Sequence, residues 1–132
     1  MTVFVETDFL LAIAKDDDWL QEYAEEALTD LEVVTSPIAY LELLIVLERY
    51  QFDYVRLFAN LLEIVPAGDK TEQQIVLKAV NYFEDGMTPF DAFHAAIAET
   101  RGLPILSSDS VYEEIDPKRI ALEPQNQNNG EI

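Results

Sequence analysis

The sequence has no cysteine, a single histidine and few basic residues, and each scarcity excludes a class of site. Without cysteine there is no disulfide, no thiolate metal ligand and no cysteine nucleophile. One histidine, His94, is too few for a zinc site built on imidazole nitrogens. No apolar stretch approaches the roughly 18 residues of a membrane span, and the first residues lack the features of a signal peptide. We therefore expect a cytoplasmic protein that stays out of membranes.

Acidic residues are abundant where basic residues are scarce. The chain has 26 acidic and 8 basic residues, which gives a formal net charge of −18 at pH 7. Such a surface repels itself and repels phosphates unless salt screens it, and the screening length falls to about 3 Å at 1 M salt. Because 49% of the residues are hydrophobic, the chain is not of the disordered class. The composition favours adaptation to a salt-rich cytosol, as in a halophilic archaeon, and an ordinary acidic protein is the alternative.

Short β-prone segments alternate with longer segments of helical character. Strands are expected at residues 2–5, 33–35, 64–65, 104–106 and 119–122. Helices are expected at residues 8–15, 16–28, 37–47, 53–62, 71–84, 88–101 and 110–115. This alternation predicts an α/β protein with three α/β/α layers and a central, mostly parallel sheet. We assign one domain to residues 1–123 and a polar tail, expected to be disordered, to residues 124–132.

Acidic residues recur where a parallel sheet would have its ligand site. The five carboxylates that follow predicted strands, or lie in the first turns of predicted helices, are Glu6, Asp8, Glu42, Asp91 and Asp109. In such sheets the ligand site lies beyond the carboxyl ends of the strands. Carboxylates gathered in one cleft repel each other unless a cation neutralises them. Ligands that are all oxygen suit hard cations, so the sequence predicts a site for Mg²⁺ or Mn²⁺.

Each carboxylate also has a purely structural interpretation. Asp8 and Asp109 could each cap the short helix beside it. Asp91 lies in a sequence that matches a capping box, and most such matches are only caps. Glu42 favours a function, because a lone acid inside an apolar run needs a partner or a purpose. Glu6 could be a solvated acid at the end of a strand, but that strand is apolar on both faces and is therefore expected to be buried on both sides.

The single histidine lies near one of these carboxylates. His94 follows Asp91 by three residues and is expected on roughly the same helix face. There it could approach the metal or bind a phosphate. A partly buried histidine among alanines is the simpler interpretation of His94.

Four motifs in this order resemble the PIN domain family, which includes the VapC-type toxins. They are Glu6-Thr7-Asp8-Phe9-Leu10-Leu11, Ser36-Pro37-Ile38-Ala39-Tyr40-Leu41-Glu42-Leu43, Asp91-Ala92-Phe93-His94-Ala95-Ala96-Ile97-Ala98 and Leu106-Ser107-Ser108-Asp109. The similarity covers about residues 2 to 122, and the motif that begins at Asp91 is its most specific piece. The family has aspartate at the position of Glu6, so the side chain here is one methylene longer, and Asp8 replaces the family's asparagine or serine.

The resemblance implies a Mg²⁺- or Mn²⁺-dependent endoribonuclease. The implied catalytic and metal-binding residues are Glu6, Glu42, Asp91 and Asp109, with Asp8 as a further metal ligand. The residues implied to orient these ligands are Thr7, Ser36, Ser107 and His94. RNA is the implied substrate, and an antitoxin protein and a second copy of the chain are the implied partners.

Two alternatives stay open beside the nuclease. A PIN fold with weakened activity could serve as a binding module, which Glu6 and the shortage of basic residues for holding RNA would favour. A receiver or phosphatase domain could also gather carboxylates for Mg²⁺. The receiver and the phosphatase are both disfavoured, because a receiver needs a lysine after a late strand and an aspartyl-phosphate phosphatase needs aspartate where Glu6 stands.

Overall fold

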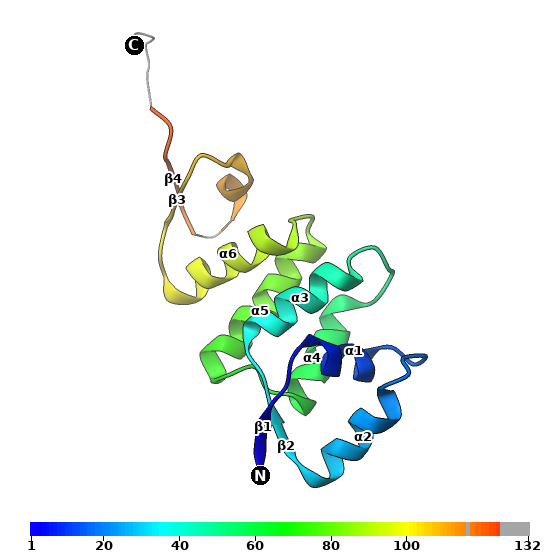
Figure 1. Cartoon of the computed structure of the whole chain (residues 1–132). Helices are drawn as coiled ribbons and strands as arrows, with labels where there is room; N and C mark the ends of the chain where they lie inside the picture. The colour runs from blue at the N-terminus through cyan, green and yellow to red at the C-terminus, as the bar shows by residue number, and fades with distance from the viewer. Residues whose placement is uncertain (116, 125–132) are drawn as a thin grey trace.

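Helices make up most of the structure, a computed structural model that describes residues 1–115 and 117–124 (Figure 1). The α-helices of these residues are α1 (Thr7–Ala14), α2 (Gln21–Asp30), α3 (Pro37–Leu47), α4 (Tyr54–Ile64), α5 (Lys70–Glu84) and α6 (Pro89–Arg101). The other elements are the strands β1 (Thr2–Phe4), β2 (Glu32–Val34), β3 (Ile105–Ser107) and β4 (Arg119–Ala121) and the 3₁₀ helix η1 (Ser110–Glu114). The tail expected at 124–132 lies, beyond its first residue, outside the described residues.

The strands form two parallel pairs. β1 pairs with β2, and β3 pairs with β4, each over three residues. The expected α/β class with parallel strands is confirmed. In the described residues, however, the central sheet is divided into these two pairs, and Figure 1 shows β3–β4 beyond α6, away from β1–β2.

The strand expected at 64–65 is wrong. Helix α4 continues through the first of these residues, and the Val65 N–H then donates to the Leu61 carbonyl oxygen at 2.7 Å. The helix therefore captures a donor that a strand would need for its ladder. An isolated parallel bridge between Thr35 and Ala67 is what forms in this region.

The helix expected over residues 16–28 begins only at Gln21. Asp18 explains the delay, because its Oδ1 accepts a hydrogen bond from the Leu20 N–H at 2.8 Å and folds the chain into a turn. Trp19 lies in that turn and is 79% exposed.

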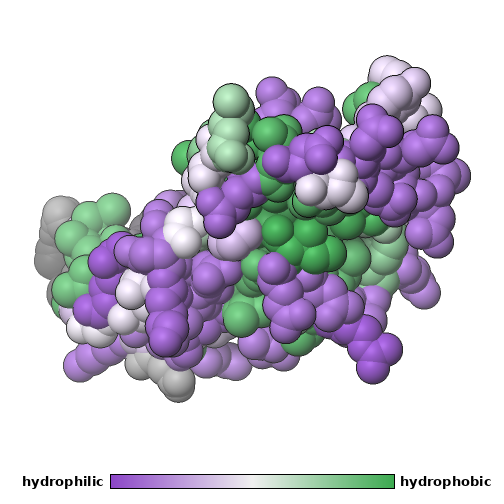
Figure 2. Space-filling model, turned by 90° about the horizontal axis from the view of Figure 1, so that it is seen from below, coloured by the Kyte–Doolittle hydropathy of each residue, from purple (hydrophilic) through white to green (hydrophobic). Residues whose placement is uncertain are grey.

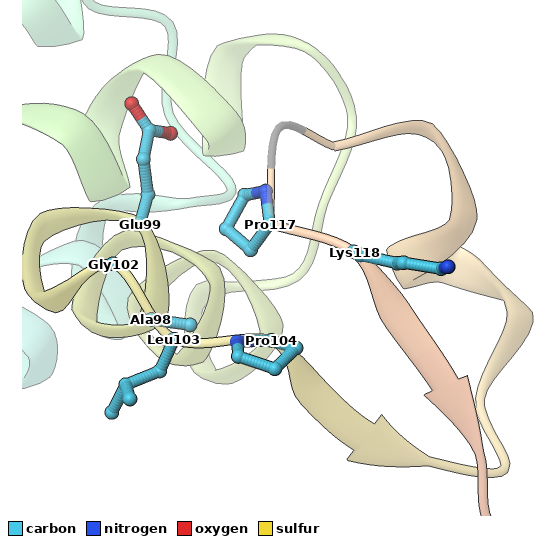
Figure 3. Close-up of a pocket in the computed structure, with 7 residues that line it drawn as sticks. All are labelled: Ala98, Glu99, Gly102, Leu103, Pro104, Pro117 and Lys118. Atoms are coloured by element: carbon cyan, nitrogen blue, oxygen red, sulfur yellow. The ribbon is translucent and has the colours of Figure 1, made fainter.

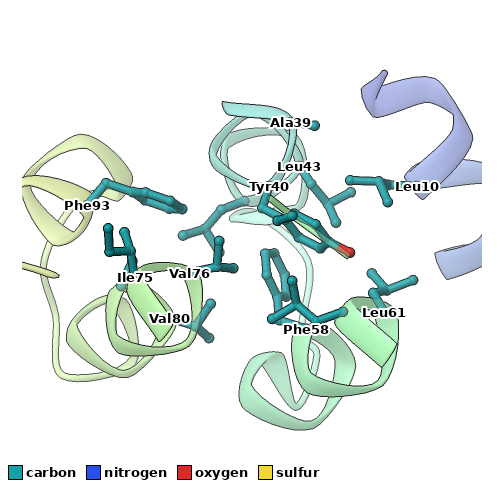
Figure 4. Packing of buried hydrophobic residues seen from close by; sticks show 14 of the residues in the cluster. Leu10, Ala39, Tyr40, Leu43, Phe58, Leu61, Ile75, Val76, Val80 and Phe93 are labelled. Atoms are coloured by element: carbon teal, nitrogen blue, oxygen red, sulfur yellow. The ribbon is translucent and has the colours of Figure 1, made fainter. Parts of the chain in front are cut away.

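The hydrophobic core is centred on α3, α4 and α5, and Leu10 of α1 and Phe93 of α6 pack against it; the labelled side chains point toward one another (Figure 4). Tyr40 of α3 is fully buried, stacks at a tilt on Phe58 with 5.7 Å between ring centroids, and donates its hydroxyl to the Val65 carbonyl oxygen at 2.7 Å. Leu43 of α3 and Val76 of α5 are also fully buried. Each such side chain stabilises the fold by about 1.5–3 kcal/mol, so α3 is a rigid support for the residues on its outer face.

The expectation that the first strand is buried on both sides is wrong. Phe4 of β1 is 67% exposed, and Val3 is only half-buried. The reason is the division of the sheet, since a pair of strands on its own cannot cover both of its faces and edges. In the described residues, no helix combines the length and the apolar character that crossing a bilayer takes.

Candidate metal centre

The first group of predicted site residues is organised by a buried hydroxyl at the start of α1. Thr7 is 7% exposed and donates its hydroxyl to Glu42 Oε1 at 2.5 Å. The same oxygen lies 3.4 Å from the carbonyl oxygen of Ala39. The Thr7 hydroxyl has a single proton to donate, so it bonds to Glu42, the nearer of the two acceptors. Thr7 therefore joins α1 to α3 and fixes the carboxylate of Glu42 beside the start of α1.

Two more carboxylates adjoin Thr7 in the chain. Glu6 occupies the N-cap position of α1 but makes no side-chain capping bond, and Asp8 lies in the first turn. The capping interpretation of Asp8 is therefore wrong, because the helix begins one residue earlier. Both side chains are exposed, and negative charge at a helix N-terminus is favourable. We call Glu6, Thr7, Asp8 and Glu42 the Thr7 cluster.

The second group lies at the N-terminus of α6. The Asp91 N–H donates to the N-cap hydroxyl of Thr88 at 3.3 Å, so this half of the expected capping box is present. The carboxylate of Asp91 has another partner, since its Oδ1 accepts a hydrogen bond from the Tyr112 hydroxyl at 3.2 Å. The acid of this motif is thus tied to η1.

Tyr112 joins Asp91 to the last predicted carboxylate. Burial chiefly, and then the negative charges of Asp91 and Asp109, raise the pKa of Tyr112 to about 12. Its hydroxyl therefore stays protonated at neutral pH and remains a donor. Asp109 caps η1 through a bond from the Val111 N–H at 3.0 Å, so the capping interpretation of Asp109 is confirmed. We call Asp91, Asp109 and Tyr112 the Tyr112 cluster.

The residues predicted to orient the ligands have different surroundings. Ser107 accepts a hydrogen bond from the Asp109 N–H at 3.0 Å, which places it beside that carboxylate. Ser36 occupies the expected N-cap position of α3 but makes no side-chain capping bond. His94 is exposed, so the expectation of a partly buried histidine is wrong. The smaller alanines on either side of it fill the buried positions of α6 instead.

Two residues of the segment that carries β3, η1 and β4 were not identified from the sequence. Tyr112 carries the link between Asp91 and Asp109, and its position three residues after Asp109 was the only available signal. Arg119 donates to the carbonyl oxygen of Ser107 at 2.5 Å and to the Glu113 carboxylate at 2.7 Å. It therefore ties β4 to β3 and η1, whereas the sequence showed it only as one of a few basic residues.

The chemistry of these ligands suits Mg²⁺ or Mn²⁺, because all the carboxylate and hydroxyl donors are hard oxygens. The positions of these side chains, however, do not suit a single metal ion. Among the residues that the structure describes, no three or more acidic or histidine side chains are grouped so as to hold a metal ion. The Thr7 cluster adjoins β1–β2, whereas Asp91 lies in the first turn of α6, and Asp109 and Tyr112 lie between β3 and β4 in the chain. Figure 1 shows β3–β4 away from β1–β2.

A separate hollow lies at the C-terminal end of α6 (Figure 3). Its volume is about 450 Å³, and it is lined by Ala98, Glu99, Gly102, Leu103, Pro104, Pro117 and Lys118. This lining contains one carboxylate and none of the predicted ligands. The hollow is therefore not part of the metal centre, although it adjoins the segment that connects α6 to β3.

Comparison with known proteins identifies a family for almost the whole chain. The family model of the PIN domain matches residues 3–118. No curated protein and no solved structure matches the chain. The matched span includes all five predicted carboxylates and both clusters.

Proposed function

The chain belongs to the PIN domain family, and from this premise we propose that it is a metal-dependent endoribonuclease of the VapC type. PIN domains are generally nucleases that use divalent metal ions, and this chain shares their fold. The observation that carries the proposal is the hydrogen bond from buried Thr7 to Glu42. It holds two separate acidic motifs together, with Glu42 of α3 beside Glu6 and Asp8 at the start of α1.

The proposal assigns roles to the carboxylates. Glu6, Glu42 and Asp91 would hold the main Mg²⁺ or Mn²⁺ ion, and Asp109, with or without Asp8, would complete the site, which requires the Thr7 cluster and the Tyr112 cluster to come together. When bound, the ion supplies a more acidic water and neutralises charge on the leaving oxygen of a phosphodiester.

Two protein hydroxyls support these ligands. Thr7 orients Glu42, since its proton fixes one carboxylate oxygen and leaves the other for the ion. Tyr112 does the same for Asp91. The longer side chain of Glu6 reaches about one bond further than aspartate would from the end of β1.

RNA is the proposed substrate, and a salt-rich cytosol is the proposed setting. The net charge of −18 supports the setting, because only screened phosphates could approach this surface. Folding should weaken as KCl is lowered, since unscreened repulsion acts on the compact state. Equal unfolding midpoints in low and molar KCl would contradict the adaptation to salt.

The VapC resemblance also supports two proposed partners. One is an antitoxin protein that keeps the nuclease inactive, and the other is a second copy of the chain. A short antitoxin-like reading frame beside the gene would favour the first.

Mn²⁺ binding and RNA cleavage, measured together in molar KCl, test the proposed function. Mn²⁺ should raise the melting temperature, because a ligand of the native state stabilises it by mass action. Glu42→Gln should lose both this shift and the cleavage. Glu25→Gln is the control, since Glu25 is an exposed acid of α2 outside both clusters. No heat and no thermal shift with Mn²⁺ in the wild type would end the nuclease proposal.

A second candidate function is a binding module of the PIN fold that cuts nothing. It is favoured by one observation, the lack of any metal-holding group of acidic side chains within the described residues of one copy. RNA that binds in the absence of Mn²⁺ and is never cleaved would support this candidate.

A further inference from the structure

A small hollow lies between α1 and α2, which Figure 1 shows side by side. Its volume is about 240 Å³. Residues on one face of each helix line it, Asp8 and Ala12 on α1 and Ala24 and Ala27 on α2. Alanine is too small to fill the space between two packed helices, so the hollow stays open.

Each helix also contributes one aromatic side chain to the lining of the hollow. Phe9 of α1 is half-buried, and Tyr23 of α2 is 64% exposed. Among the described residues, neither ring packs against another aromatic ring. Two aromatic side chains beside a floor of alanines suit a flat ligand, which can lie against them by offset or edge contact.

The size of the hollow limits what can occupy it. Pockets that hold drug-sized ligands have about 300–1,000 Å³. A hollow of about 240 Å³ therefore takes a single ring system rather than a larger ligand or a helix of a partner.

Asp8 gives the hollow a polar rim. Its side chain is exposed and, in the part of the chain that is described, accepts no hydrogen bond. An ionised carboxylate can only accept hydrogen bonds, so it favours an occupant with N–H donors. Asp8 also belongs to the Thr7 cluster, so the hollow is continuous with the candidate site.

We propose that the hollow between α1 and α2 binds one unstacked base of single-stranded RNA, with its ring against Phe9 and Tyr23 and its N–H donors on Asp8. Stacking on aromatic side chains and hydrogen bonding at the Watson–Crick edge is the common way to hold an unpaired base. Guanine suits this rim best, because it presents two neighbouring N–H donors to the two carboxylate oxygens. Adenine and uracil lack such a pair.

Charge favours a base over a phosphate at this place. Glu22 and Glu26, exposed residues of α2, adjoin Tyr23 and Ala27 in the chain, so a phosphate in the hollow would be repelled. Figure 2 shows surface of the same kind over one face of the molecule, with hydrophobic patches between hydrophilic residues. An uncharged ring avoids the repulsion and enters without salt to screen it.

A base in the hollow brings its own phosphates close to the Thr7 cluster, because Asp8 belongs to both. Asp8 then serves the base, and the ion is left to the other four carboxylates. Single-stranded RNA cut beside guanosine is thus the substrate class. This last step rests on the proposed function, whereas binding of the base does not.

Fluorescence of Trp19 tests binding of the base without any metal. Trp19 is the single tryptophan and directly precedes Leu20, which lines the hollow. The probes are short uridine oligomers that contain one guanosine, one adenosine or neither, titrated in molar KCl with EDTA. The oligomer with guanosine should quench Trp19 and bind about tenfold more tightly than the others. Equal binding of the three oligomers, or none, would overturn the proposal.

Two substitutions test the stacking and the rim separately. Tyr23→Ala should weaken each oligomer at least about fivefold, and Phe90→Ala is its control, since Phe90 is 58% exposed on α6. Asp8→Asn should remove only the preference for guanosine. Asp17→Asn makes the same charge change at an exposed position outside the hollow and should keep the preference. A preference that survives Asp8→Asn would overturn the role of Asp8.

Filling the hollow separates this proposal from the proposed function. Ala27→Phe should abolish binding of the base but keep the circular dichroism spectrum and the Mn²⁺ thermal shift. Wild type that binds guanosine in EDTA but neither binds Mn²⁺ nor cuts RNA would end the nuclease proposal and leave the hollow intact. Wild type and Ala27→Phe that cut RNA at the same places would do the reverse. Binding of leucinamide or argininamide in place of every oligomer would make the hollow a protein-docking site and overturn the proposal.

Discussion

The Thr7 cluster and the Tyr112 cluster are built from similar residues on very different supports. The Thr7 cluster stands on α3, whose inner face carries the fully buried Leu43, and its carboxylates are exposed. The Tyr112 cluster joins the start of α6 to the segment between β3 and β4, whose strands expose apolar side chains, and its carboxylates already accept hydrogen bonds. The first cluster is therefore rigid and open to a cation. The second is satisfied internally, so a cation has to compete with Tyr112 and with the N-terminus of η1.

The largest expected effect on stability comes from a substitution in the hydrophobic core beneath the Thr7 cluster. Leu43→Ala should lower the free energy of unfolding by about 2–5 kcal/mol, because it leaves a cavity under α3. Leu106→Ala should change it much less in the monomer, since Leu106 is 61% exposed. Chemical denaturation of both variants at low protein concentration measures the difference. Equal losses would mean that β3 is as well supported as α3.

The hydrogen bonds within the clusters give the next largest effect. Thr7→Val should cost about 0.5–1.5 kcal/mol of stability, because it removes the bond to Glu42 without opening a cavity. It should also weaken the Mn²⁺ thermal shift, since Glu42 loses its fixed orientation. Thr29→Val removes a hydroxyl that bonds within α2 at an exposed position and serves as the control. An unchanged Mn²⁺ response in Thr7→Val would refute its orienting role.

Tyr112 provides a smaller effect that depends on pH. Burial raises the pKa of Tyr112 in the folded protein to about 12, above its ordinary value of 10.0. Its contribution is therefore fully present below pH 10 and is lost as the pH rises toward 12. Unfolding midpoints of the wild type and Tyr112→Phe between pH 9 and pH 12 measure this contribution. The wild type should lose more stability over that range than the variant, and parallel curves would contradict the burial of this hydroxyl.

The smallest expected change in stability separates structure from function at Asp91. Asp91→Asn keeps an oxygen that can accept from Tyr112, and the Thr88 cap uses only the backbone of residue 91. Stability without metal should therefore stay within about 0.5 kcal/mol of the wild type, while the Mn²⁺ thermal shift should disappear. A variant that is clearly destabilised yet keeps its full Mn²⁺ response would make this residue structural and favour the binding module.

The sequence predicted the elements best where local signals were strong. Helices α4 and α6 begin just after their caps Asp53 and Thr88, close to the starts expected at residues 53 and 88, because a side-chain acceptor before an amphipathic segment favours a helix start there. The prediction failed at residues 64–65, where the helix continued through the β-branched Ile64. It also failed at Asp18, whose side chain bonds to the backbone in competition with α2. Neither outcome is visible in periodicity, since both depend on which hydrogen bond forms.

The sequence predicted the residues of the candidate site but not the contacts between them. The motifs identified the carboxylates and placed Thr7 beside them, but only the fold shows Thr7 bonded to Glu42 and Tyr112 bonded to Asp91. These contacts join residues 35 and 21 positions apart, so no local pattern could reveal them. Which carboxylates hold the ion stays a prediction.

The contacts of the basic side chains, including the ion pairs of Arg119, affect how this protein binds a polyanion. Arg119 is bonded to Glu113 and Glu123, Lys78 is bonded to Glu99, and Lys15 and Arg49 both lie over the Tyr50 ring. Half of the 8 basic residues are thus engaged within the molecule. The affinity of a protein for single-stranded RNA falls with salt in proportion to the phosphates that it neutralises. A surface with few basic side chains available to RNA releases few counterions when RNA binds. RNA held by metal coordination would therefore keep most of its affinity at high salt.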